Sequence, residues 1–321
     1  MIDPALLDWL LDPENPSARA LTLRHLLGRP DQDPEVVEAC TAIASMPQVR
    51  AMCSAQFPGG YWIKPDRGYS PRHKATIWQL LALADLGMPR TEAIARGCEH
   101  VLSTALHSGI GLFSAHQHST GIFPCLNGDL LRVLWHFGYG AHEIVRRVAM
   151  TLAQRVLAEG WICPHNGTHP RQRDTWQPCL WGCVKVLRGF AAIPPAARSH
   201  DVRRAIEEGV AFLCAHDLSR DQGPERDDEP AHWRQFGFPL GVESDLLEAL
   251  LALVEVGVPI DQPDAVQVIV DKRLPSGVWA LEYPLANAWA DFGTQGESKW
   301  VTLRALRVLD HVTPGPPLPR G

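Results

Sequence analysis

The sequence lacks long hydrophobic runs, and this absence excludes membrane insertion. No stretch reaches the ~18 to 20 consecutive apolar residues that a helix needs to cross a bilayer. The first residues, Met1 to Pro4, also lack the positively charged start and apolar core of a secretory signal. We therefore expect a cytoplasmic protein with no transmembrane segment.

Positive charge is also in short supply. The chain has 30 Lys and Arg residues against 36 Asp and Glu, which gives a net charge of −6. This balance excludes the basic footprint of a nucleic-acid-binding protein. Hydrophobic residues make up 45% of the chain and charged residues 21%, so a compact globular fold is expected. Eight cysteines without an export signal predict reduced thiols or metal ligands, not a disulfide framework.

A repeated pattern of helices is the strongest positive signal. Each strongly apolar helical run is followed by a more polar one and then, in most copies, by a glycine-aromatic turn such as Gly160-Trp161. A helix that is apolar on most of its circumference belongs inside a fold, and one with a polar stripe belongs outside. The apolar runs recur about every 55 residues, and the residues that close them are Gly28, Gly87, Gly138, Ile193, Gly257 and Val312.

This pattern predicts an all-α protein of six helical hairpins, each with one inner and one outer helix. Residues 1–313 would form a single domain and residues 314–321 a proline-rich tail. Six hairpins could stack as an open solenoid or close into a ring. The last inner helix carries Thr302-Leu303-Arg304, which repeats Thr22-Leu23-Arg24 of the first. This match favours a closed (α/α)6 toroid, in which the first and last inner helices fit one another.

These repeats and their turns resemble the (α/α)6 toroids of terpenoid cyclases and protein prenyltransferases. More specifically, the chain is similar to bacterial prenyltransferase and squalene oxidase repeat proteins, whose activity is not settled. The resemblance implies an enzyme that acts on a small apolar, isoprenoid-like molecule in a central cavity. The matching segments extend over nearly the whole chain and include Thr22-Leu23-Arg24, Thr76-Ile77-Trp78, Pro124-Cys125-Leu126, Val184-Lys185-Val186-Leu187, Phe236-Gly237-Phe238-Pro239-Leu240 and Ser298-Lys299-Trp300.

The sequence departs from these families at their reactive motifs. It has no Asp-x-Asp-Asp acid, with which class II cyclases protonate an alkene. Its nearest acidic run, Asp227-Asp228-Glu229, also lacks the spacing of an Asp-rich magnesium motif. The zinc ligands of protein prenyltransferases do not map onto the chain residue by residue, and the Cys-His-Gly motif of lanthipeptide cyclases is missing. Any chemistry must therefore come from other residues.

Three cysteines and a histidine are the candidate metal ligands. Cys125 and Cys179 stand at matching starts of neighbouring inner helices, and Cys163 lies in the loop between their hairpins, two residues before His165. Three thiolates and one imidazole can hold zinc tetrahedrally. Helix N-termini favour the thiolate form, which helps metal binding and reactivity alike. Simple packing of small buried residues and a reactive thiol remain open alternatives.

Polar residues at the other inner-helix starts would face one mouth of the ring. His73, Asp129 and Asp245 are the candidate catalytic groups, because a carboxylate or imidazole in a closed site can act as general acid or base. Capping of first helical turns is the alternative reading. The tryptophans of the turns are expected to be structural wedges, and those of the inner helices either line an apolar cavity or fill the core.

Three functional classes remain open at this point. The chain could be an enzyme for a small apolar molecule with zinc at one rim, an apolar-ligand-binding protein with a structural metal, or a helical scaffold for protein interactions.

Overall fold

The computed structural model describes residues 2–157, 160–164, 166, 176–220, 232–285, 292–293 and 296–312. These residues are mostly helical, which confirms the predicted all-α class. The apolar runs form α2 (Pro16–His25), α5 (Thr76–Asp85), α7 (Pro124–His136), α9 (Leu180–Ala191), α11 (Leu246–Val256) and α13 (Lys299–Asp310). The other helices are α1 (Pro4–Leu10), α3 (Pro34–Ala42), α4 (Pro47–Ser54), α6 (Glu92–Thr104), α8 (Glu143–Gln154), α10 (His200–Cys214) and α12 (Pro263–Asp271), with 3-10 turns η1 (Ile43–Ser45), η2 (Ser119–Gly121) and η4 (Pro195–Ala197).

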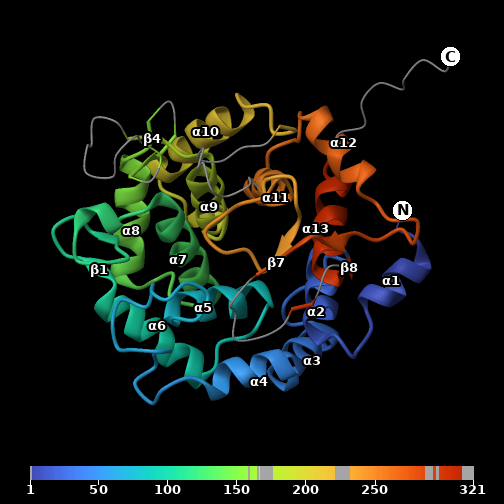
Figure 1. Cartoon of the computed structure of the whole chain (residues 1–321), viewed down its shortest axis with the longest axis horizontal. Helices are drawn as coiled ribbons and strands as arrows, with labels where there is room; N and C mark the ends of the chain where they lie inside the picture. Colours follow the sequence, from blue (N-terminus) through green and yellow to red (C-terminus); the bar gives the residue numbers. More distant parts are fainter. Residues whose placement is uncertain are drawn as a thin grey trace.

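Burial separates the two kinds of helix as the hydrophobic pattern predicts. Helix α5 buries every residue from Thr76 to Ala84, so it has no face toward solvent. Helix α8 buries one stripe only, at the helical spacing of Val145, Val148 and Leu152. In Figure 1, α5, α7, α9, α11 and α13 lie nearer the centre of the molecule than α6, α8, α10 and α12. Helix α5 is therefore enclosed by protein, whereas outer helices such as α8 cover the core with one face.

The inner helices contact one another in chain order. Helix α5 packs against α7, α7 against α9, α9 against α11, α11 against α13, and α13 against α2. Side chains from the two ends of the chain join in this series: the indole N–H of Trp300 donates to Ser17 Oγ (2.9 Å), whose hydroxyl donates to the Leu86 carbonyl (2.8 Å). The predicted contact between the first and last inner helices is thus observed.

The closest contact lies between α7 and α9, and a glycine makes it possible. A Cβ atom added at Gly128 would stand 2.4 Å from the carbonyl of Lys185, so only a residue without a side chain fits there. The two backbones touch at this point, and Asp129 is brought beside Lys185 in the buried interior.

The turn tryptophans are wedges, as expected. Trp62, Trp161 and Trp279 are buried at the turns that end three of the hairpins, and each indole N–H donates to a carbonyl of the preceding outer helix. The acceptors are Met52 (2.7 Å), Leu152 (2.8 Å) and Ile269 (2.7 Å). This shared bond fixes the end of an outer helix to the turn that follows it.

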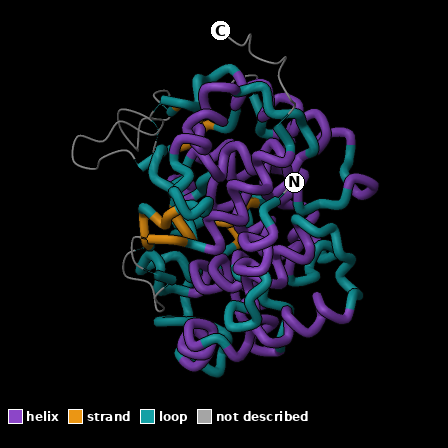
Figure 2. The backbone as a smooth tube through the Cα atoms, turned by 90° about the vertical axis from the view of Figure 1, so that its right-hand side faces the viewer, coloured by secondary structure: helices purple, strands orange, loops and turns teal. Residues whose placement is uncertain are grey.

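Short strands accompany these turns and lie toward one side of the helical layer (Figure 2). They form four two-stranded pairs, three antiparallel and one parallel. The pairs join β1 (Leu106–His107) to β2 (Leu112–Phe113), β3 (Ile162–Cys163) to β4 (Gln177–Pro178), β5 (Gly237–Phe238) to β7 (Tyr283–Pro284) and β6 (Ala280–Leu281) to β8 (Gly296–Glu297).

Candidate functional site

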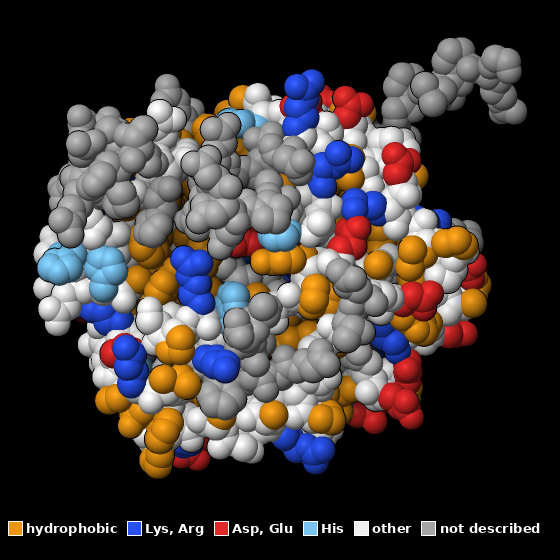
Figure 3. Space-filling model, viewed as in Figure 1, with side chains coloured by type: hydrophobic (Ala, Val, Ile, Leu, Met, Phe, Trp, Pro, Cys, Tyr) orange, Lys and Arg blue, Asp and Glu red, His pale blue; other side chains and the backbone are white. Residues whose placement is uncertain are grey.

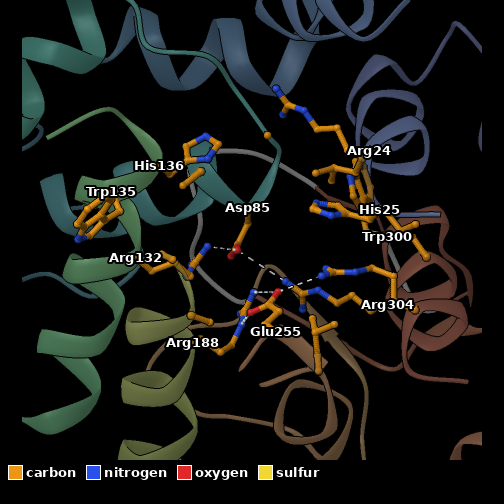
Figure 4. A pocket seen from close by; sticks show the side chains of 18 of the residues that line it. Arg24, His25, Asp85, Arg132, Trp135, His136, Arg188, Glu255, Trp300 and Arg304 are labelled. Carbon is orange, nitrogen blue, oxygen red and sulfur yellow. Dashed lines mark hydrogen bonds and ion pairs between the residues drawn. The ribbon is translucent and has the colours of Figure 1, made fainter. Parts of the chain in front are cut away.

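A cavity of about 700 Å³ lies where the C-terminal halves of the inner helices converge. All six inner helices contribute to its wall, so it occupies the centre of the helical arrangement. Figure 4 shows the labelled side chains approaching this centre from several helices. Its wall carries many charges: six arginines (Arg24, Arg90, Arg132, Arg188, Arg304 and Arg307) and three carboxylates (Asp31, Asp85 and Glu255).

The cavity therefore has twice as many arginines as carboxylates, although the whole chain is acidic with a net charge of −6. On the face seen in Figure 3, by contrast, basic and acidic side chains are interspersed, without an extended basic patch among the residues described. The cavity wall thus carries an excess of positive charge that the chain as a whole does not have. A wall of this kind differs from the apolar lining that an isoprenoid-like molecule would need.

Asp85 is shared by two of the arginines. It is the last residue of α5, and its Oδ1 lies 3.0 Å from Arg132 Nη1 on α7 and 3.7 Å from Arg304 Nη2 on α13. Only 5% of the Asp85 side chain is exposed. Figure 4 shows the carboxylate between the two guanidinium groups. Arg304 is also placed by the ring of Phe238, 4.8 Å from its guanidinium carbon, so aromatic packing fixes the arginine independently of Asp85.

A second group of charges lies between α9, α11 and α13. Glu255 accepts from Arg188 Nε (2.9 Å) and pairs with Arg307 Nη2 (3.3 Å), while Arg188 Nη1 also donates to Glu248 (2.6 Å). Lys185 Nζ lies 2.9 Å from the other oxygen of Glu248, and both side chains are almost fully buried. Charges taken out of water in this way are tolerated only when they are paired and hydrogen-bonded.

The pKa shifts show how strongly these charges act on one another. Burial raises the pKa of Glu255, but the Arg188 and Arg307 guanidiniums outweigh it and lower that pKa to about 2. Burial lowers the pKa of Arg307; Glu255 raises it, and Arg188 and Arg304 lower it again. Desolvation within the cavity, followed by the charge of Arg307, lowers the pKa of His25 to about 3, although part of the ring is open to the cavity. His25 is therefore neutral at neutral pH, and the local potential is positive.

The predicted catalytic residues lie away from this wall. Asp129 and Asp245 are buried near the N-terminal ends of α7 and α11, and neither lines the cavity. Burial raises the pKa of each carboxyl to about 6. Asp245 caps α11, accepting from the Glu248 N–H (2.6 Å) and from the Gly237 N–H (2.9 Å), so the capping alternative holds for it.

The same bond pattern recurs in other repeats. Thr76, Asn127 and Thr302 lie in the first turns of inner helices. Their side chains accept from the backbone N–H groups of the turn residues Trp62, Phe113 and Trp279, at 3.1, 2.8 and 2.9 Å. Asp245 thus holds a structural position of the repeat.

His73 lies on the loop before α5 in the left-handed backbone region, with a φ of 63°. Its ring meets Trp78 edge-on, with the ring centroids 5.5 Å apart. None of His73, Asp129 and Asp245 lines the central cavity.

The three predicted metal-binding cysteines are buried thiols at the N-terminal side of the inner helices. Cys125 is in the first turn of α7 and Cys179 caps α9, which confirms their predicted matching positions. Burial, followed by the nearby Cys179 and Asp129, raises the pKa of Cys125 to about 12, which favours the protonated thiol over the thiolate that a helix N-terminus alone would favour.

His165, the fourth predicted ligand, lies outside the described residues. Among the residues that are described, no three His, Cys, Asp or Glu side chains come together as a metal site requires. The zinc site stays a prediction.

A second, smaller pocket of about 440 Å³ lies beside these cysteines. Pro124 and Pro164, the neighbours of Cys125 and Cys163, line it together with mostly apolar side chains. The principal apolar residues are Ile110, Ile122, Phe123, Leu152, Trp161 and Ile162.

Sequence reasoning missed the arginines of the central cavity. Their signal was present, because Arg24, Arg132, Arg188 and Arg304 each interrupt an otherwise apolar inner-helix run. An arginine within a helix that has no solvent face must meet either a buried carboxylate or a cavity. The repeated Thr-Leu-Arg predicted only that the first and last inner helices pack against one another.

The chain matches no model of a known protein family, and a search of curated proteins finds no significant relative. Among the described residues, no helix is both long enough and apolar enough to cross a membrane.

Proposed function

We propose that this chain is a closed (α/α)6 toroid that binds a small anionic molecule, a carboxylate or phosphate compound, in its central cavity. The observation that carries the proposal is the excess of six arginines over three carboxylates on the cavity wall. The volume of about 700 Å³ falls within the ~300 to 1,000 Å³ typical of small-molecule pockets. Ring closure is supported by the serial contacts from α5 through α13 to α2 and by the Trp300–Ser17–Leu86 hydrogen bonds.

Helix dipoles account for only part of the arginine excess. Helix C-termini attract cations, but this effect falls off within the last turn. Arg24, Arg188 and Arg307 are in last turns, where the dipole explains them. Arg132 and Arg304 precede the last turns of α7 and α13, so the helix dipole does not account for their presence in the cavity wall.

The chemistry of arginine favours the proposed ligand class. The planar guanidinium presents several N–H donors in a fork that matches carboxylate and phosphate oxygens. In the central cavity these forks come from different helices, and Arg132 Nε is buried without a hydrogen-bond partner in the part of the chain described. Guanidinium groups from several helices can therefore meet the oxygens of one anion from different directions.

The test compares two arginine variants for binding of sulfate and citrate by calorimetry. Arg132→Gln removes a cavity guanidinium, whereas the control Arg96→Gln removes a surface one whose partner, Glu92, also lies at 3.0 Å. We expect wild type to bind at least one of the two anions and Arg132→Gln to weaken it about tenfold, as loss of one charge-assisted bond implies. Arg96→Gln should bind as wild type does. Equal weakening by both variants, or no binding by wild type, would contradict the proposal.

A second candidate function keeps the isoprenoid-like substrate and the zinc that the family resemblance implies. Its support is the mostly apolar pocket of about 440 Å³ beside Cys125 and Cys163, at the opposite end of α7 from the charged cavity. In this reading an apolar molecule lies against Trp161 and Phe123, and zinc is held by Cys125, Cys163, Cys179 and His165.

Metal analysis of the purified protein tests this second candidate. We expect about one zinc per chain in wild type and a large loss of zinc in Cys125→Ser and Cys179→Ser, since each removes a thiolate ligand. Cys98→Ser is the control, because Cys98 is a buried thiol on the outer helix α6. Metal-free wild type, isolated without chelators, would exclude the zinc site.

A further inference from the structure

The central cavity contains its own anion. Asp85 reaches from the end of α5 to lie against Arg132 of α7 and Arg304 of α13. Helices α5 and α7 are neighbours, but α13 is in contact with α2 and α11, so the carboxylate bridges separate parts of the wall. One carboxylate faces two guanidiniums, so the three groups together carry one net positive charge.

Arg304 has contacts that hold it without Asp85. Arg304 rests on the Phe238 ring at 4.8 Å and its Nη1 donates to the Gly237 carbonyl at 3.4 Å. Phe238 in turn stacks on Trp300, with ring centroids 4.8 Å apart and planes 3° from parallel. Arg132 lies on α7, whose backbone is fixed against α9 at Gly128, and its Nη1 pairs with Asp85 at 3.0 Å. Two guanidiniums with a counter-ion between them, one of them held independently of that counter-ion, form an anion site already filled from within.

The tether gives Asp85 an advantage over any free anion. A group attached to the same molecule competes as though present at an effective concentration on the order of millimolar or more. A free carboxylate with a single charge gains nothing by taking its place, since it replaces one charge with another and leaves Asp85 buried and unpaired. An anion with two charges makes stronger contacts with both guanidiniums, and these contacts can offset the cost of leaving Asp85 unpaired.

We infer that Asp85 is a specificity-determining residue of the cavity, an internal counter-ion that excludes singly charged anions and must be displaced by a ligand with two or more negative charges. This inference rests on the proposed anion-binding function. It narrows the ligand class to dicarboxylates, tricarboxylates and phosphate compounds.

The experiment measures the affinity of the full-length protein for acetate and sulfate by calorimetry. Asp85→Asn keeps the shape of the side chain but removes its charge. We expect wild type to bind sulfate and not acetate, and Asp85→Asn to bind sulfate at least about tenfold more tightly and to bind acetate measurably. The control is Glu92→Gln, which removes a carboxylate outside the cavity that also pairs with an arginine, Arg96 (3.0 Å), and is 92% exposed. This control should change either affinity by less than about twofold.

The outcomes separate this inference from the proposed function. If wild type binds sulfate and Asp85→Asn binds both anions no more tightly, the cavity is an anion site but Asp85 is not its competitor. If neither protein binds sulfate, both proposals fail. Sulfate binding by Asp85→Asn alone would show that Asp85 blocks doubly charged anions as well, which would overturn its assignment as a counter-ion that selects by ligand charge. Asp85→Ser serves as a second uncharged variant where the asparagine protein does not fold, and it carries the same expectations.

Discussion

At the scale of single residues, Asp129 shows how burial and pairing oppose each other in this interior. Its side chain is 4% exposed and lies beside Lys185, where the backbones of α7 and α9 touch. Burial raises the pKa of this carboxyl to about 6, although the charges of Lys185 and Arg132 lower it. In the folded chain Asp129 therefore holds its proton more tightly than in the unfolded chain, where its pKa is near 3.8.

This shift predicts the direction of a pH effect on stability. A group whose pKa is raised on folding stabilises the fold below its unfolded pKa, and that contribution is lost as pH rises through the folded pKa. Asp129→Asn does not titrate, so we expect its free energy of unfolding to gain on that of wild type between about pH 4 and 6. The gain should reach at most about 3 kcal/mol, since one pKa unit is worth about 1.4 kcal/mol.

Urea unfolding of the two proteins at several pH values measures the difference. Asp310→Asn, which removes an exposed carboxylate from the end of α13, is the control and should show no such trend. A difference between wild type and Asp129→Asn that stays constant from pH 4 to 6 would show that the carboxyl is not perturbed by burial.

At the scale of elements, the tryptophan turns hold each hairpin to the next. The Trp161 indole N–H donates to the Leu152 carbonyl at 2.8 Å inside the protein. The second repeat has Phe113 at the corresponding turn, so the aromatic ring can be accommodated without the N–H. The hydrogen bond is the feature that Trp161 adds.

We expect Trp161→Phe to lower the free energy of unfolding by about 1 to 3 kcal/mol, because the Leu152 carbonyl loses its buried partner. Trp135→Phe is the matched control, since its indole N–H is buried without a hydrogen-bond partner in the described part of the chain. Its loss should be smaller by at least about 1 kcal/mol. Chemical denaturation of both variants measures the two losses, and equal losses would assign the effect to ring packing alone.

At the scale of the whole molecule, the inner and outer helices could be predicted because a helix that is buried on all sides has apolar residues around its whole circumference. Thr76 to Ala84 reads as an enclosed helix and is one. The central charges could not be predicted in the same way. Whether Arg132 meets a carboxylate, a cavity or solvent depends on Asp85, 47 positions earlier in the chain, and on Arg304, far beyond it. Such pairings depend on how six helices are placed around one centre. Residue spacing alone does not determine this placement.

The candidate site illustrates the same limit. Spacing correctly placed Cys125 and Cys179 at neighbouring helix starts, because helix length fixes which end a residue occupies. Spacing could not show that both carboxylate oxygens of Asp245 accept from backbone N–H groups. One of these groups, that of Gly237, belongs to a turn outside the helix. Local pattern thus located the residues, and tertiary contacts assigned their roles.

The hydrogen bond between Trp300 and Ser17 joins residues 283 positions apart, and it has a consequence for the order of folding. Contacts this distant in sequence form late, because a long loop must close first. Helix α13, which makes this contact, also supplies Arg304 and Arg307. During synthesis Asp85 and Glu255 therefore each lack one of their two arginine partners until α13 has left the ribosome. Without α13 the cavity wall has four arginines against three carboxylates, and α13 raises this to six against three.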